Sequence, residues 1–201
     1  IVTPLIRKLA EEGYEVTVNA TSYSVAILEN NPWVANVVCQ EREAIPNEYG
    51  ELDEYWGIWK PRYDRYINLS ESLEGALLKV EGRREFFTHQ AWRHERCNKN
   101  YYDYTFEFAG YKDVRNGCIG ELHFTVEEEV KMKDWIKWAK GKDNSYLILW
   151  CLAGSGRNKV YPFAGQIQKE LLERDPNLKI VTVGEKDCRM LEIKHDRIIR
   201  M

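Results

Sequence analysis

A glycine-rich segment with a hydroxyl and an ammonium group is the part of the sequence best suited to bind an anion. It reads Ala-Gly-Ser-Gly-Arg-Asn-Lys-Val-Tyr-Pro over residues 153–162. Gly154 and Gly156 leave room for a ligand beside the backbone. Ser155 offers a hydroxyl, and Lys159 offers a full positive charge. If the segment joins the end of a strand to the start of a helix, the backbone N–H groups of that helix add partial positive charge. Together these groups could hold a phosphate or a diphosphate.

The same segment is also compatible with a tight turn between a strand and a helix, with Lys159 in solvent. It lacks the third glycine of a dinucleotide-binding fingerprint, because Lys159 stands at that place. It is not a P-loop either, since no glycine directly precedes the lysine. The residues alone leave both interpretations open.

The elements around this segment predict a βαβ unit. Residues Tyr146–Ala153 form an apolar run of strand length without polar alternation. We therefore expect a strand covered by helices on both faces, with Cys151 as inert packing inside it. A helix over Pro162–Arg174 and a strand over Lys179–Val183 complete the unit, so the two strands should be parallel.

The amino-terminal half predicts a similar alternation of helices and strands. In chain order we expect a helix that begins near Pro4 and stops at Gly13, a strand over Tyr14–Asn19, a helix over Ser22–Asn30 and a strand over Val34–Cys39. Helix, strand, helix and strand at this spacing imply parallel βαβ units.

The next segment, residues 40–62, is polar, acidic and aromatic and contains several glycine and proline residues. This composition predicts an irregular loop over a cleft. Tyr55, Trp56 and Trp59 could stack on a sugar there, or they could pin the loop to the domain. A strand over Arg65–Leu69 is expected to follow.

A basic run lies between two further predicted helices, over Glu71–Val80 and Tyr101–Ala109. It covers residues 82–100 and is rich in arginine, histidine and asparagine. Arg93 and Arg96, on one helical turn, could project together toward an anionic acceptor. The alternative is a solvated loop that compensates the acidic segment upstream.

A helix start marks the boundary between the halves. Thr125 and Glu128 have the spacing of a capping box, and the helix should run to about Ala139. We therefore predict an α/β protein with two Rossmann-like domains built on parallel sheets. The first domain covers residues 1–140 and lacks its opening strand. Residues 145–201 form the start of the second domain, which is truncated.

Composition narrows the classes of function. The formal net charge is -3 and the pI about 5.9, which argues against general binding to nucleic acid or anionic membranes. No apolar stretch approaches the roughly 20 residues that span a bilayer. The dispersed cysteines predict reduced thiols rather than a disulfide framework. His89 and His94 lack a third ligand at matching spacing, so we expect no metal site.

Three stretches of the chain together resemble the family 9 glycosyltransferases, typified by ADP-heptose:lipopolysaccharide heptosyltransferases. Residues 2–9 are similar to the family's first helix, and residues 63–78 to its mid-domain strand and helix. Gly154-Ser155 with Lys159–Pro162 is similar to the element P-G-S/A…K-x-W-P, with Tyr161 in place of tryptophan. The matches follow the family's order over nearly the whole chain.

The resemblance implies a GT-B enzyme, in which two Rossmann-like domains face a cleft. The acceptor, a glycan or glycolipid of the lipopolysaccharide type, would bind the first domain, and a nucleotide-sugar donor the second. The implied reaction transfers a heptose-like, ADP-linked sugar with inversion, without a metal or other cofactor. The resemblance implies that Lys159 and Ser155 contact the donor phosphates. Gly154 and Gly156 complete the predicted phosphate site by allowing a close approach of the backbone. The candidate acceptor ligands are Arg93, Arg96 and Ser72.

The resemblance also implies that the family's catalytic aspartate would precede Ile1 and that its D-T-G…H donor motif would follow Met201. We therefore expect no catalytic residue within the chain and no sugar transfer by residues 1–201 alone. A cytoplasmic protein with at most peripheral membrane contact is expected. Two alternatives stay open: a GT-B enzyme such as a UDP-sugar 2-epimerase, and a diverged nucleotide-sugar-binding protein without catalysis.

Overall fold

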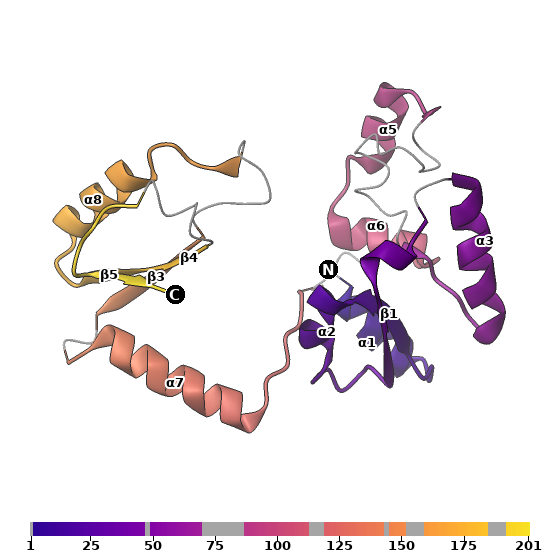
Figure 1. Cartoon of the computed structure of the whole chain (residues 1–201), viewed down its shortest axis with the longest axis horizontal. Helices are drawn as coiled ribbons and strands as arrows, with labels where there is room; N and C mark the ends of the chain where they lie inside the picture. Colours follow the sequence, from indigo (N-terminus) through magenta and orange to yellow (C-terminus); the bar gives the residue numbers. More distant parts are fainter. Residues whose placement is uncertain are drawn as a thin grey trace. The chain divides into compact units, whose positions relative to one another are not determined.

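The computed structural model describes residues 2–46, 49–69, 87–112, 119–142, 145–151, 159–184 and 192–201. The chain forms two compact units, Ile1–Phe124 and Thr125–Met201. Each unit has helices and a small sheet whose described strands are all parallel (Figure 1). The predicted α/β class with parallel sheets is confirmed, and it is compatible with a Rossmann-like fold.

The first unit contains one parallel pair of described strands. Its elements are α1 (Thr3–Glu11), β1 (Thr17–Thr21), α2 (Ser22–Leu28), β2 (Asn36–Gln40), α3 (Tyr49–Trp59), α5 (Gln90–Cys97) and α6 (Tyr101–Phe108), with 3-10 turns η1 (Arg42–Ala44) and η2 (Lys60–Arg62). Strand β1 pairs with β2 from Thr17 opposite Asn36 to Thr21 opposite Gln40. Helix α2 connects the two strands, so the predicted βαβ unit is confirmed.

Helix α1 packs against the end of α6. It stops before Gly13, whose φ of 93° is a conformation that glycine adopts without strain. On the apolar side of α1, Leu5 and Leu9 are buried together with Phe106 and Ala109. Burial of one leucine contributes about 1.5–3 kcal/mol, so this contact is a main attachment of α1 to the unit.

The prediction of an irregular loop over residues 40–62 was wrong, because the described part of this segment contains α3 and both 3-10 turns. Leu52 is only 1% exposed, and it shares a helical face with three aromatic residues at the spacing i+3, i+4 and i+7. These residues are Tyr55, Trp56 and Trp59. The rings of Tyr55 and Trp56 meet edge to face at 4.8 Å, and Trp59 lies 4.8 Å from the Arg62 guanidinium.

The strand predicted over residues 65–69 was also wrong, since these described residues join no sheet. Ile67 and Leu69 instead pack against the core between α1 and α6. The helix predicted over residues 71–80 lies outside the described residues. The described part of the basic run forms α5, and the helix predicted from Tyr101 is confirmed as α6.

The second unit is built on a three-stranded parallel sheet. Its elements are α7 (Val126–Lys140), β3 (Tyr146–Cys151), α8 (Ala164–Arg174), β4 (Leu178–Val183) and β5 (Ile198–Arg200). The strand order is β3-β4-β5. Helix α8 connects β3 to β4 (Figure 1). Its Leu172 packs against Leu178, Ile180 and Ile198. The predicted βαβ unit is confirmed, whereas β5 was not predicted.

Helix α7 begins with the predicted capping box. The Thr125 hydroxyl accepts a hydrogen bond from the Glu128 N–H at 3.1 Å, and the Glu128 carboxylate accepts one from the Thr125 N–H at 2.8 Å. At the other end, the Lys179 ammonium of β4 donates to the carbonyl oxygens of Ala139 and Lys140 at 2.9 and 3.0 Å. These bonds attach α7 to the second unit, although the predicted boundary placed it in the first domain.

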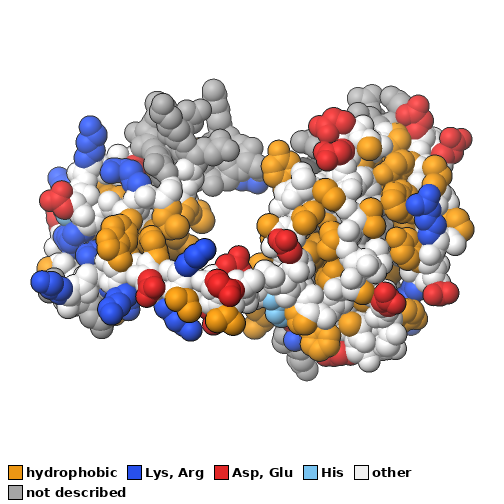
Figure 2. Space-filling view, turned by 60° about the horizontal axis from the view of Figure 1, so that its bottom comes forward, with side chains coloured by type: hydrophobic (Ala, Val, Ile, Leu, Met, Phe, Trp, Pro, Cys, Tyr) orange, Lys and Arg blue, Asp and Glu red, His pale blue; other side chains and the backbone are white. Residues whose placement is uncertain are grey.

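The prediction that helices cover β3 on both faces was wrong. Tyr146 is 70% exposed and Leu149 66%, and Cys151 is exposed as well. Among the described strands β3 has a neighbour on one side only, so β4 takes the central place and is the buried strand. Figure 2 shows apolar side chains at the surface of both units.

Candidate functional site

The predicted anion site belongs to the connection between β3 and α8. Strand β3 ends at Cys151 and α8 begins at Ala164, so this connection leaves the sheet at its carboxyl edge. Ligands of parallel α/β sheets bind outside that edge. Lys159 is exposed and precedes the turn that enters α8. The other three predicted phosphate ligands, Gly154, Ser155 and Gly156, lie outside the described residues.

The amino terminus of α8 is electrostatically positive. Phe163 occupies the N-cap position and makes no side-chain hydrogen bond to the first turn. The backbone N–H groups of that turn therefore have no capping side chain, and a helix terminus of this kind carries about half a positive charge. From Lys159 to Lys169 the sequence contains no aspartate or glutamate. This end of the unit can attract an anion.

Two aromatic side chains accompany Lys159 in the turn before α8. Tyr161 is 50% exposed and Phe163 is 58% exposed. Their rings meet edge to face, with centroids 5.8 Å apart and an interplanar angle of 70°. Sequence analysis singled out Tyr161 but missed Phe163. The available signal was a pair of aromatic residues around Pro162, directly before a predicted helix.

A buried polar network supports the carboxyl ends of β4 and β5. The Thr182 hydroxyl donates to the Glu192 carboxylate, which also pairs with Arg200 Nε at 2.6 Å. The Glu192 side chain is only 1% exposed. Gln168 of α8 accepts a hydrogen bond from the Ile193 N–H at 3.2 Å. Because a buried carboxylate must be paired, this network fixes residues 192–193 against the sheet and α8.

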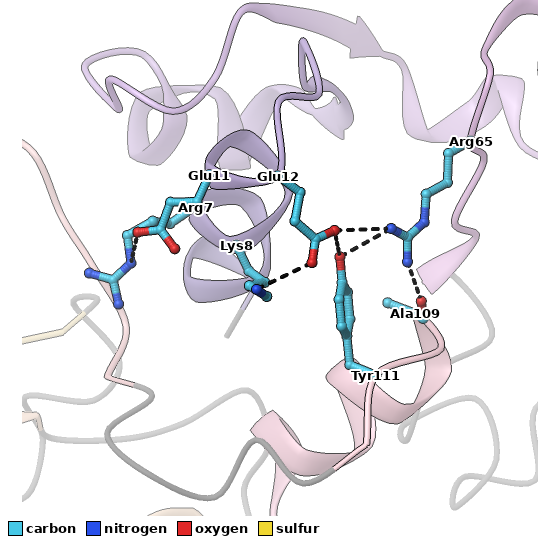
Figure 3. Close-up of polar contacts among 7 residues, drawn as sticks. All are labelled: Arg7, Lys8, Glu11, Glu12, Arg65, Ala109 and Tyr111. Atoms are coloured by element: carbon cyan, nitrogen blue, oxygen red, sulfur yellow. Dashed lines mark hydrogen bonds and ion pairs between the residues drawn. The ribbon is translucent and has the colours of Figure 1, made fainter.

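A second polar cluster lies in the first unit and is centred on Glu12 (Figure 3). The Tyr111 hydroxyl donates to Glu12 Oε2 at 2.5 Å, and Arg65 Nη1 lies 3.4 Å from the same oxygen. Lys8 Nζ lies 3.2 Å from the other carboxylate oxygen. Arg65 Nη2 donates to the Ala109 carbonyl, just after α6, at 2.7 Å. We call Lys8, Glu12, Arg65 and Tyr111 the Glu12 cluster.

The pKa values in this cluster follow from its contacts. The hydrogen bond from Tyr111, helped by Lys8 and Arg65, holds the pKa of Glu12 below its usual value against a smaller effect of desolvation. Burial and the hydrogen bond to Glu12 raise the pKa of Tyr111. A carboxylate whose oxygens are both engaged, and which stays ionised, is a poor proton acceptor. The Glu12 cluster is therefore a structural tie and not a candidate base.

The candidate acceptor ligands lie in or near α5. Arg93 is only 4% exposed, so the alternative of a solvated loop was wrong for this residue. Arg96 lies one turn further along α5, and its side chain is outside the described residues, as is all of Ser72. His89 caps α5 by accepting a hydrogen bond from the Ala91 N–H through Nδ1 at 3.3 Å. The acceptor role of these residues stays a prediction.

Two findings on metal binding and membrane spans apply to the described ranges alone. No group of three or more histidine, cysteine, aspartate or glutamate side chains there could hold a metal ion. In the same part of the chain, no helix is both long and apolar enough to cross a bilayer. Metal-independent chemistry stays a prediction.

No protein-family model, curated protein or solved structure matches the chain. The fold defines the chain as an α/β protein with two small parallel sheets. Any function must therefore be argued from its own residues and from the sequence resemblance.

Proposed function

We propose that the chain belongs to an inverting, metal-independent glycosyltransferase of the GT-B type, similar to family 9. The proposed reaction transfers a heptose-like sugar from an ADP-linked donor to a glycan or lipopolysaccharide-type acceptor. The proposal includes a cytoplasmic location, since a lipid-linked acceptor would be met at the inner face of the membrane. The second unit would bind the donor, and the first unit would face the acceptor.

One observation carries the proposal: in the parallel β3–α8–β4 unit, exposed Lys159 stands just before the turn that enters α8 at Ala164. The connection leaves the sheet at its carboxyl edge, where the N–H groups of the following helix can bind a diphosphate. When the nucleoside diphosphate departs, negative charge builds on its outer phosphate. A lysine and a helix amino terminus near that phosphate would stabilise the charge.

The test is nucleotide binding by the whole chain, measured by isothermal titration calorimetry with ADP, UDP and GDP. We expect ADP to bind. Lys159→Met should lower the affinity for ADP about ten- to hundredfold, the loss expected for one charge-assisted hydrogen bond. The matched control is Lys169→Met, which removes an exposed lysine of α8 that pairs with Glu173 at 3.8 Å. Absence of binding by all three nucleotides, or equal effects of the two substitutions, would contradict the proposal.

A further inference from the structure

We propose that Tyr161 and Phe163 form a stacking platform for the nucleobase of the nucleotide. This inference rests on the proposed function, because it names the group that binds beside the diphosphate. Both side chains are at least half exposed. Removal of an apolar ring surface from water is favourable, so a pair of exposed rings beside a proposed ligand site indicates a contact surface.

The backbone presents this pair in a fixed way. The Tyr161 carbonyl accepts a hydrogen bond from the Ala164 N–H at 3.2 Å, and the Phe163 carbonyl accepts one from the Ile167 N–H at 3.0 Å. Ala164, the first residue of α8, is 1% exposed and anchors the turn. The rings therefore project from a turn that is tied to α8, and binding would cost little ordering of the backbone.

The two rings are not stacked face to face on each other. The interplanar angle of 70° directs the edge of one ring at the face of the other. In such an arrangement each ring still has at least one face that its partner does not cover. Planar bases stack on aromatic faces of this kind, with little dependence on which base is present.

Charge selects the class of ligand. Lys159 precedes Tyr161 by two residues, a stretch that spans at most about 7 Å. No acidic residue occurs in the sequence from Lys159 to Gln168. The platform therefore adjoins a positive region, and a nucleoside diphosphate combines a flat base with the negative charge that such a region attracts. An uncharged acceptor sugar could also place an apolar face on the rings, but it lacks the negative charge that the positive region attracts.

The experiment measures binding of ADP, adenosine and inorganic pyrophosphate to the whole chain by calorimetry. Tyr161→Ala and Phe163→Ala should each lower the affinity for ADP about five- to hundredfold, the usual range for loss of one stacked aromatic ring. The affinity for adenosine should fall by a similar factor, while the affinity for pyrophosphate should change less than twofold. Tyr161→Phe keeps the ring and should bind ADP like the unmodified chain. Tyr23→Ala, which removes a ring that is 88% exposed in the first unit, is the matched control.

The outcomes separate this inference from the proposed function. Loss of ADP and pyrophosphate binding by Lys159→Met, together with full ADP affinity in both alanine variants, would overturn the platform alone. Weaker ADP and adenosine binding in the alanine variants, with no effect of Lys159→Met, would support the platform and contradict the diphosphate site. Equal weakening of ADP and pyrophosphate by Tyr161→Ala would overturn the platform, provided that circular dichroism shows an intact fold.

Discussion

The Tyr111 hydroxyl donates a hydrogen bond of 2.5 Å to the Glu12 carboxylate, across 99 positions of the sequence. The same ring meets Phe106 edge to face, with centroids 5.9 Å apart. One side chain thus joins the apolar core between α1 and α6 to the polar cluster at the end of α1. Arg65 adds a third segment to this tie through Ala109. The first unit therefore depends on contacts between residues that are distant in the chain.

Tyr111→Phe should destabilise the first unit while preserving its core. The substitution keeps the ring against Phe106 but removes the hydroxyl, so Glu12 loses a donor and Arg65 loses an acceptor at 3.1 Å. We expect a lower urea midpoint for the unfolding of the chain, measured by circular dichroism. Tyr23→Phe removes the hydroxyl of an exposed tyrosine and should leave the midpoint unchanged. Equal midpoints for the two variants would show that the hydrogen bond contributes nothing.

The Glu12 cluster should also make stability depend on pH in the acid range. The pKa of Glu12 is lowered from its usual value of 4.5, first by Tyr111 and then by Lys8 and Arg65. A lowered folded-state pKa means that the carboxylate stabilises the fold above the unfolded-state pKa. This contribution is lost as the pH falls through the folded-state value.

The measurement compares the free energy of unfolding of the chain and of Glu12→Gln between pH 3 and pH 7. The difference in free energy of unfolding between the two proteins should be constant above about pH 5. It should shrink as the pH falls below 4.5, the usual pKa of a glutamate. Glu29→Gln, at the exposed end of α2, is the control and should give a difference near zero throughout. A difference for Glu12→Gln that does not change with pH would contradict the assignment.

The elements that could be predicted from the sequence carry their own local signals. Gly13 and Gly110 end α1 and α6, and both adopt positive φ, at 93° and 87°. Thr125 and Glu128 start α7 within three residues of each other. Such signals depend on neighbours in the chain, so no knowledge of the tertiary structure is needed to use them.

Helix α3 was missed because the two glycine residues within it and the proline residues on either side of it, Pro46 and Pro61, outweighed its periodicity. Gly50 and Gly57 lie inside α3, and neither adopts a positive φ, so neither marks a turn. The apolar spacing from Leu52 to Trp59 was the better signal. The exposure of β3 could not be predicted, because coverage of a strand depends on its neighbours in the sheet. The pairing of Glu192 with Thr182 and Arg200 likewise has no local pattern.

The last prediction concerns Arg197, which holds together the βαβ unit that carries Lys159. Arg197 Nη1 donates to the carbonyl oxygens of Asp175 and Leu178 at 2.6 and 3.1 Å, and Nη2 donates to that of Leu172. One guanidinium therefore satisfies the end of α8 and the start of β4. Arg197→Met keeps most of the aliphatic stem but leaves these part-buried carbonyl groups without their donor. The free energy of unfolding should fall by about 2–3 kcal/mol.

Arg197→Lys separates the role of the charge from that of the forked donor group. A lysine keeps the positive charge but cannot direct two nitrogen atoms at three carbonyl groups, so its stability should lie between those of the unmodified chain and Arg197→Met. Lys194→Met removes an exposed positive charge nearby in the sequence and is the control. Urea unfolding followed by circular dichroism measures all three variants. If Arg197→Met unfolded at the same urea concentration as Lys194→Met, the α8–β4 corner would be held by its apolar contacts alone, through Leu172 and Leu178.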